Sequence, residues 1–104
     1  MKAIVIEPNK DMIWKEVENP VLKCGEVLVE VRCAGVNRAD LMQREGDYPS
    51  PEGCPEWMGL EIAGVITELG DEAREKSNWK IGDKVIPYVG ATVGGGMETT
   101  FYMF

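Results

Sequence analysis

The sequence predicts a small, mainly β domain with one short helix, and three observations support this fold class. Short β-prone segments alternate along the chain with turns rich in glycine and proline. From residue 27 to residue 33, the odd positions hold valine or cysteine, and the even positions hold Leu28, Glu30 and Arg32. This alternation is typical of a strand with one buried face. Between Asn37 and Gly46 the pattern changes to that of a helix. These features together predict a β-barrel or β-sandwich that carries one small helix.

Five further segments are expected to be strands, because each is β-prone and bounded by turn residues. Within them, Gly64 indicates a bend or a close approach of two backbones, and Pro87 indicates an edge strand or a bulge. The five segments are residues 2–7, 13–18, 59–69, 84–89 and 99–104.

The helix carries signals for both of its ends. Asn37 is a good N-cap residue, and Asp40 stands three positions later, where the acid of a capping box sits. Gly46 suits the left-handed position that follows a helix. Around the helix, residues 47–56 are expected to form an irregular loop because they contain three prolines, residues 71–80 a polar connection, and residues 90–96 a flexible segment.

Charge and composition exclude several classes of function. Eighteen acidic and eleven basic residues give a net charge of −7, which argues against nucleic acid and membrane surfaces as partners. No apolar run is long enough to span a bilayer, and the first residues lack the features of a signal peptide, so a cytoplasmic location is expected. The chain has three cysteines and no histidine, which argues against a disulfide framework, a zinc site and histidine-based catalysis.

Residues 34–49 are the most informative stretch of the chain. From spacing alone, Asn37 and Asp40 are helix-capping residues and Tyr48 is an aromatic side chain that covers a hydrophobic edge. The run N-R-A-D-L-M-Q-R-x-G-x-Y within this stretch nevertheless resembles the zinc-free quinone oxidoreductases of the medium-chain dehydrogenase/reductase superfamily, especially the p53-inducible quinone oxidoreductase group. The G-L-E-I-A-G-V-I segment at residues 59–66 and the G-D-K-V turn at residues 82–85 resemble two further motifs of that family.

This resemblance implies a GroES-like, partly open β-barrel with one or two short helices, which lines one wall of a cleft. The other wall would be a Rossmann domain that holds NADPH, and a hydride would pass from the nicotinamide to a quinone or another conjugated carbonyl. By the same resemblance, the Asn37 amide would hydrogen-bond near the nicotinamide or the substrate carbonyl, Asp40 would hold the helix in place, and Tyr48 would stack on or donate to the substrate ring. Tyr48 or water would supply the proton.

The resemblance also bears on metal binding and on one further carboxylate. Zinc-dependent relatives place a cysteine where Asn37 stands and a histidine where Leu60 stands, so no zinc is expected here. Glu61 is expected to be a structural carboxylate that accepts hydrogen bonds from backbone or arginine donors. The three glycines at residues 94–96 are expected to form a flexible loop rather than a phosphate cradle, because β-prone residues follow them.

The sequence departs from this family after the glycine loop, where residues 97–104 match its next strand poorly. Residues 1–104 are therefore expected to be one GroES-like domain without a Rossmann domain, from a truncated reading frame or a cut near a domain boundary. Such a domain would be inactive alone and would not bind NADPH by itself. It would expose an unpaired barrel edge and an apolar patch through which it could self-associate. The alternatives are a stand-alone module that binds a separate subunit or a small aromatic ligand, and a chaperonin-like ring protein.

Overall fold

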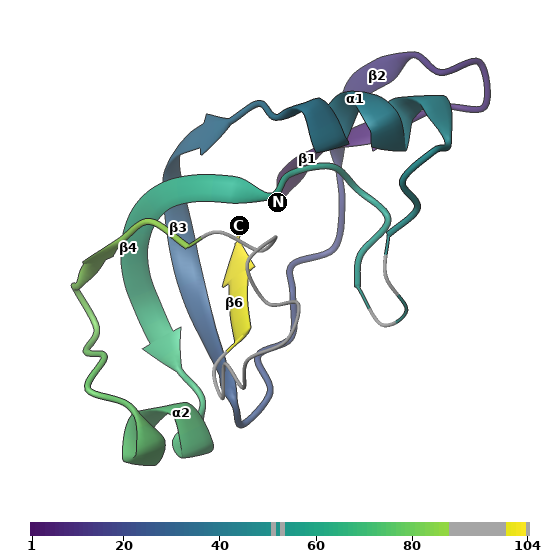
Figure 1. Ribbon diagram of the computed structural model, residues 1–104. Helices are drawn as coiled ribbons and strands as arrows, with labels where there is room; N and C mark the ends of the chain where they lie inside the picture. The colour runs from purple at the N-terminus through teal and green to yellow at the C-terminus, as the bar shows by residue number, and fades with distance from the viewer. Residues whose placement is uncertain (51, 53, 88–99, 104) are drawn as a thin grey trace.

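The computed structural model describes residues 1–50, 52, 54–87 and 100–103, and within these ranges the chain is rich in β-structure with two short helices (Figure 1). A two-stranded sheet has the order β1-β2, and a four-stranded sheet has the order β5-β4-β3-β6. The described strands do not close into a barrel, so the predicted mainly β, partly open architecture is confirmed. The elements are β1 (Lys2–Ile6), β2 (Met12–Glu16), β3 (Glu26–Gly35), α1 (Arg38–Glu45), β4 (Glu61–Leu69), α2 (Asp71–Lys76), β5 (Lys84–Val85) and β6 (Thr100–Met103).

The long antiparallel pair β3–β4 organises the larger sheet, with β6 parallel to β3 and β5 antiparallel to β4 on the two outer sides. The predicted close approach at Gly64 is confirmed. A Cβ atom at this position would collide with the Glu30 carbonyl oxygen and lie 2.6 Å from Val29 Cγ1. Only a glycine at position 64 therefore allows β3 and β4 to approach each other this closely.

The core is formed by side chains of the larger sheet, and α2 contributes Ala73 to it. Val27, Val29 and Ile66 are the largest side chains that are fully buried, and Leu69 and Ala73 join them.

The predicted alternation along β3 is confirmed for its first half, where Val27 and Val29 are buried. It fails toward the end of the strand, where Cys33 is exposed. The register shifts between Val31 and Cys33, so the strand changes which face it presents there.

The α1 helix begins and ends as the sequence predicts. Asn37 is the N-cap in an extended conformation, and the capping box with Asp40 is present. Gly46 follows the helix in the left-handed conformation, with φ of 88°. Its N–H donates to the Gln43 carbonyl at 3.1 Å, and the Asp47 N–H donates to the Met42 carbonyl at 2.9 Å. This pair of bonds is a Schellman motif, which fixes where the following loop starts.

The segment expected to be a polar connection contains α2, so that prediction was wrong for residues 71–76. Acidic residues lie in the first turn of α2 and basic residues in its last turn, which the helix dipole favours. Ala73 is its one buried residue, at 1% exposed. A helix anchored by a single small side chain gives almost no apolar periodicity, and this is why the sequence pattern did not reveal it.

Strand boundaries differ from the expected ones by one or two residues at most ends. The largest difference is β5, which covers only Lys84–Val85 and not residues 84–89. Ile86 and Pro87 lie outside it, and Ile86 is 77% exposed, so the strand stops before the proline, which cannot donate to a ladder. The expected strand at residues 99–104 is confirmed as β6, whereas the predicted flexible loop at residues 90–96 lies outside the described residues.

The β1–β2 hairpin and α1 lie at one end of the β3–β4 pair, and α2 lies at the other end (Figure 1). The hairpin turns at residues 7–11, where the Lys10 N–H donates to the Glu7 carbonyl at 2.8 Å. On the other side of β1, the Met58 N–H donates to the Ile4 carbonyl at 3.1 Å. The loop before β4 is therefore attached to the smaller sheet.

Candidate functional site at the start of helix α1

The predicted residues Asn37 and Asp40 lie together where β3 passes into α1. The backbone N–H of Asn37 donates to Asp40 Oδ2 at 2.7 Å, and the Asp40 N–H donates to the Asn37 carbonyl at 3.1 Å. Asp40 is 3% exposed, and it is the only buried residue of the helix. Its other oxygen, Oδ1, is buried and has no hydrogen-bond donor among the described residues. This carboxylate therefore fixes the start of the helix and keeps one acceptor unused.

Glu61 completes this group of residues. Asn37 Nδ2 donates to Glu61 Oε2 at 3.0 Å, across 24 positions of sequence. The donor that Glu61 meets is thus a side-chain amide, and not the backbone or arginine donor expected from the sequence. The partnership depends on the β3–β4 register, in which Gly35 is paired with Glu61. That register has no signature in the sequence, so this contact could not be predicted there.

Tyr48 does not join this group. It lies three residues beyond the C-terminal end of α1, whereas Asn37 precedes the helix, and the eight residues of α1 rise by about 12 Å along its axis. The Tyr48 side chain is 39% exposed, and no hydrogen bond links it to Asn37 or Asp40 within the described residues. A shared role of the three predicted site residues would therefore need a ligand large enough to extend along the helix.

An open hollow borders the C-terminal half of α1, between that helix, the β1–β2 hairpin and the loop that follows the helix. Gln43 attaches the loop, because its Nε2 donates to Ser50 Oγ at 3.2 Å and to the Glu56 carbonyl at 3.0 Å. The hollow does not include the predicted site residues. Its lining includes Ile6, Lys10, Lys15, Gln43, Arg44 and Trp57.

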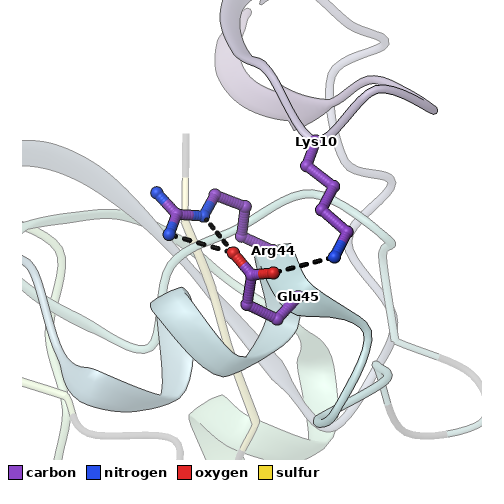
Figure 2. Close-up of polar contacts among 3 residues, drawn as sticks. All are labelled: Lys10, Arg44 and Glu45. Carbon is purple, nitrogen blue, oxygen red and sulfur yellow. Dashed lines mark hydrogen bonds and ion pairs between the residues drawn. The ribbon is translucent and has the colours of Figure 1, made fainter.

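Charged residues join the hairpin to α1 beside this hollow (Figure 2). Lys10 Nζ lies 2.8 Å from Glu45 Oε2, and the guanidinium of Arg44 lies 3.0 Å from Glu45 Oε1. The Lys10 hydrogen bond, with help from Arg44, lowers the pKa of Glu45 below its usual value. The ion pair spans 35 positions of sequence, so it connects two elements that the chain itself does not place together.

The described helix N-termini do not fit the pyrophosphate of a dinucleotide. At α1 the position is taken by the Asp40 carboxylate, which would repel a phosphate. At α2 the N–H of Ala73, in the first turn, already donates to the Cys24 carbonyl at 3.0 Å. Asp71 and Glu72 make that turn acidic, which also opposes a phosphate.

The structure also bears on the cysteines, on metal binding and on membrane-spanning segments. Cys24, Cys33 and Cys54 are free and exposed. No group of three or more potential metal ligands gathers within the described ranges. The part of the chain that the structure describes has no helix both long and apolar enough to cross a membrane. The three glycines at residues 94–96 lie outside the described residues.

Comparison with protein families matches residues 23–101 to the alcohol dehydrogenase GroES-like domain. Among curated relatives, an alcohol dehydrogenase of Geobacillus stearothermophilus is 40% identical over 96 residues, which is 90% of this chain and 28% of that protein. The synaptic vesicle membrane protein VAT-1 homolog of Danio rerio is 47% identical over 70 residues, which is 64% of this chain and 13% of that protein. The chain thus spans between 13% and 28% of the length of these relatives.

Solved structures show the same fold. The alcohol dehydrogenase TADH from Thermus sp. ATN1 superposes with a TM-score of 0.67 at 30% identity, over 83% of this chain and 24% of that chain. The quinone oxidoreductase of Escherichia coli complexed with NADPH superposes with a TM-score of 0.63 at 26% identity, over 82% of this chain and 25% of that chain. The expected relation to quinone oxidoreductases of the medium-chain dehydrogenase/reductase type is confirmed, and the chain belongs to the alcohol dehydrogenase GroES-like domain family.

Proposed function

We propose that this chain forms the substrate-side wall of an NADPH-dependent oxidoreductase that reduces a quinone or another conjugated carbonyl compound. The observation that carries the proposal is the shared fold with the Escherichia coli quinone oxidoreductase complexed with NADPH, at 26% identity. The group of Asn37, Asp40 and Glu61 at the start of α1 supports it, because it presents an ordered amide donor at the end of the β3–β4 pair.

In this proposal the dinucleotide is held outside the described residues. NADPH would supply the hydride when bound. The described helix N-termini fit no pyrophosphate, so this chain alone would take up neither the cofactor nor a hydride from it, and it would be inactive without a second domain or subunit. The chain would contribute orientation of the substrate, which is a large part of what a protein adds to cofactor chemistry.

The residues of this chain have distinct roles in the proposal. The Asn37 amide would donate a hydrogen bond to the carbonyl oxygen of the substrate, where negative charge develops as the ring is reduced. Asp40 would keep the start of α1 in place through its bond to the Asn37 N–H. Tyr48 would stack on an extended aromatic substrate, and its phenol or a water molecule would deliver the proton. No zinc takes part in this proposal.

A domain exchange tests the proposal. This chain would replace the matching quarter of the Escherichia coli quinone oxidoreductase, and NADPH-dependent quinone reduction would be measured. We expect turnover that falls by about 100- to 1000-fold in Asn37→Ala, the range typical for loss of one donor to a developing charge. Asn78→Ala changes an exposed asparagine after α2, at the other end of the domain, and serves as the control.

Binding of NADPH, followed by its fluorescence, shows independently whether the chimera has folded. A chimera that binds NADPH but reduces none of a panel of quinones and enones would refute the proposal. Tight binding of a quinone by the chain alone, without cofactor, would instead favour the second candidate, a stand-alone module for a small aromatic ligand.

A further inference from the structure

Gly35 and Glu61 face each other in the β3–β4 ladder, and the glycine makes room for the acid. A Cβ atom at position 35 would lie 2.7 Å from Glu61 Oε2 and 3.1 Å from its Cδ. Both distances are shorter than van der Waals contact, so the carboxylate of Glu61 occupies the space that any other residue at position 35 would fill. The last residue of β3 thereby determines where the first side chain of β4 points.

The carboxylate in this space accepts a hydrogen bond from Asn37 Nδ2 at 3.0 Å. An ionised carboxylate only accepts hydrogen bonds, whereas an asparagine amide has one accepting and one donating side. The nitrogen side of the amide must therefore face Glu61, and flipping the amide would place two oxygens against each other. Glu61 engages one of the two N–H groups of the nitrogen and leaves the second available.

We propose that Glu61 is a positioning residue, which holds the Asn37 amide in the one orientation that presents a free N–H donor, and that Gly35 is required for this arrangement. The orientation of the amide is inferred from the bond between Asn37 and Glu61 and from the space that Gly35 leaves. Its use on a substrate oxygen rests on the function proposed above.

A donor held in this way selects the class of substrate. A carbonyl or quinone oxygen accepts from the fixed N–H, and the bond strengthens as that oxygen gains negative charge. A compound that offers only a donor at this position would meet another donor and leave both groups unpaired, which is costly in a partly buried site. The site would accordingly distinguish oxidised, carbonyl-bearing ligands from compounds that offer only a donor.

Side-chain amide NMR of the 15N-labelled 104-residue chain tests the orientation directly. In the unmodified protein, we expect the two Asn37 Nδ2 protons to differ, with the proton bonded to Glu61 shifted downfield and exchanging more slowly with water. In Glu61→Gln we expect the additional downfield shift and the slow exchange of that proton to be lost, because glutamine can face the amide in either orientation. Glu61→Asp keeps the charge but shortens the reach, and Gly35→Ala displaces the carboxylate, so both should also lose the signature.

Glu68→Gln is the matched control, since Glu68 is an exposed acid on the same strand and should leave the Asn37 signals unchanged. The backbone amides of the fully buried Val27 and Val29 report whether each variant is folded. Unchanged Asn37 side-chain signals in folded Glu61→Gln or folded Gly35→Ala would overturn the proposal. The NMR result is independent of any quinone, so a failure of the domain exchange and a failure of this inference are distinguishable.

Discussion

Two glycines of the β3–β4 pair have different neighbours, and this difference predicts different costs of substitution. At Gly64 a methyl group would meet the backbone of Glu30 and the side chain of Val29, neither of which can move away. At Gly35 it would meet the end of the Glu61 side chain, which can rotate out. We expect Gly64→Ala to lower the free energy of unfolding by about 1–3 kcal/mol, as overpacking of a core does.

Gly35→Ala should cost clearly less, although it displaces Glu61 from Asn37. Urea denaturation of the two variants, each compared with the unmodified chain, measures both effects. Equal destabilisation by the two substitutions would show that the neighbours do not differ as described.

Asp40 carries the buried carboxyl group on which the start of α1 depends. Asp40→Ala removes the acceptor of the Asn37 N–H, and we expect it to reduce the free energy of unfolding by about 1–3 kcal/mol. Asp40→Asn keeps one oxygen in place and should cost less. Denaturation followed by circular dichroism compares the two variants. A neutral Asp40→Ala would mean that the helix start is held by packing alone.

At the scale of elements, the ion pair between Lys10 and Glu45 connects the β1–β2 hairpin to α1. The pKa of Glu45 is lowered in the folded protein, chiefly by Lys10, so its charged form is favoured by folding. The resulting contribution is present above the ordinary glutamate pKa of about 4.3 and is lost as the pH falls through the lowered value. Since both side chains are largely exposed, the contribution should be small and should weaken in salt.

We therefore expect Glu45→Gln to destabilise the chain slightly at neutral pH and to lose this effect as the pH falls through the lowered pKa of Glu45, below which the carboxyl is protonated in both states. Urea midpoints measured from neutral pH into the acid range follow this loss. Glu72→Gln is a useful comparison, because Lys76 lowers the pKa of Glu72 within a single helix and without joining two elements. An effect of Glu45→Gln that persists at low pH would show that the residue acts through something other than its charge.

The elements also show what could be predicted from the sequence. The α1 helix was predictable at both ends because its signals are local, namely the N-cap at Asn37, the acid at Asp40 and the glycine at position 46. The α2 helix was not, because only Ala73 is buried and its stability comes from packing against the sheet. The short β5 likewise depends on its pairing with β4 and not on its own composition.

The same distinction applies to the candidate site. The closeness of Asn37 and Asp40 followed from three positions of helical spacing. The contact between Asn37 and Glu61 required the register of β3 on β4, which includes two irregularities that no local pattern reveals. Tyr48 was grouped with Asn37 by resemblance alone, and its role stays a prediction.

At the scale of the whole molecule, apolar side chains gather at the surface along β2. This strand pairs only with β1 among the described strands, and all five of its residues are exposed. Met12 is 45% exposed and Trp14 is 64% exposed. An exposed edge strand with apolar side chains is a template for pairing.

We propose that the isolated chain self-associates through this edge, and we expect sedimentation velocity to show a concentration-dependent increase in mass. Trp14→Lys should reduce the association, because a lysine on an edge strand opposes pairing. Val21→Lys changes a residue that is 82% exposed outside any strand and should not reduce it. A monomer at every concentration would contradict the proposal.

We propose that this domain shapes the substrate side of a cleft and that the dinucleotide is held elsewhere. Titration calorimetry of the purified 104-residue chain with NADPH, combined with an assay of quinone reduction by the same sample, tests it most directly. We expect no tight uptake of NADPH and no reduction of quinone by the chain alone. Tight dinucleotide binding or sustained turnover without an added domain would contradict it.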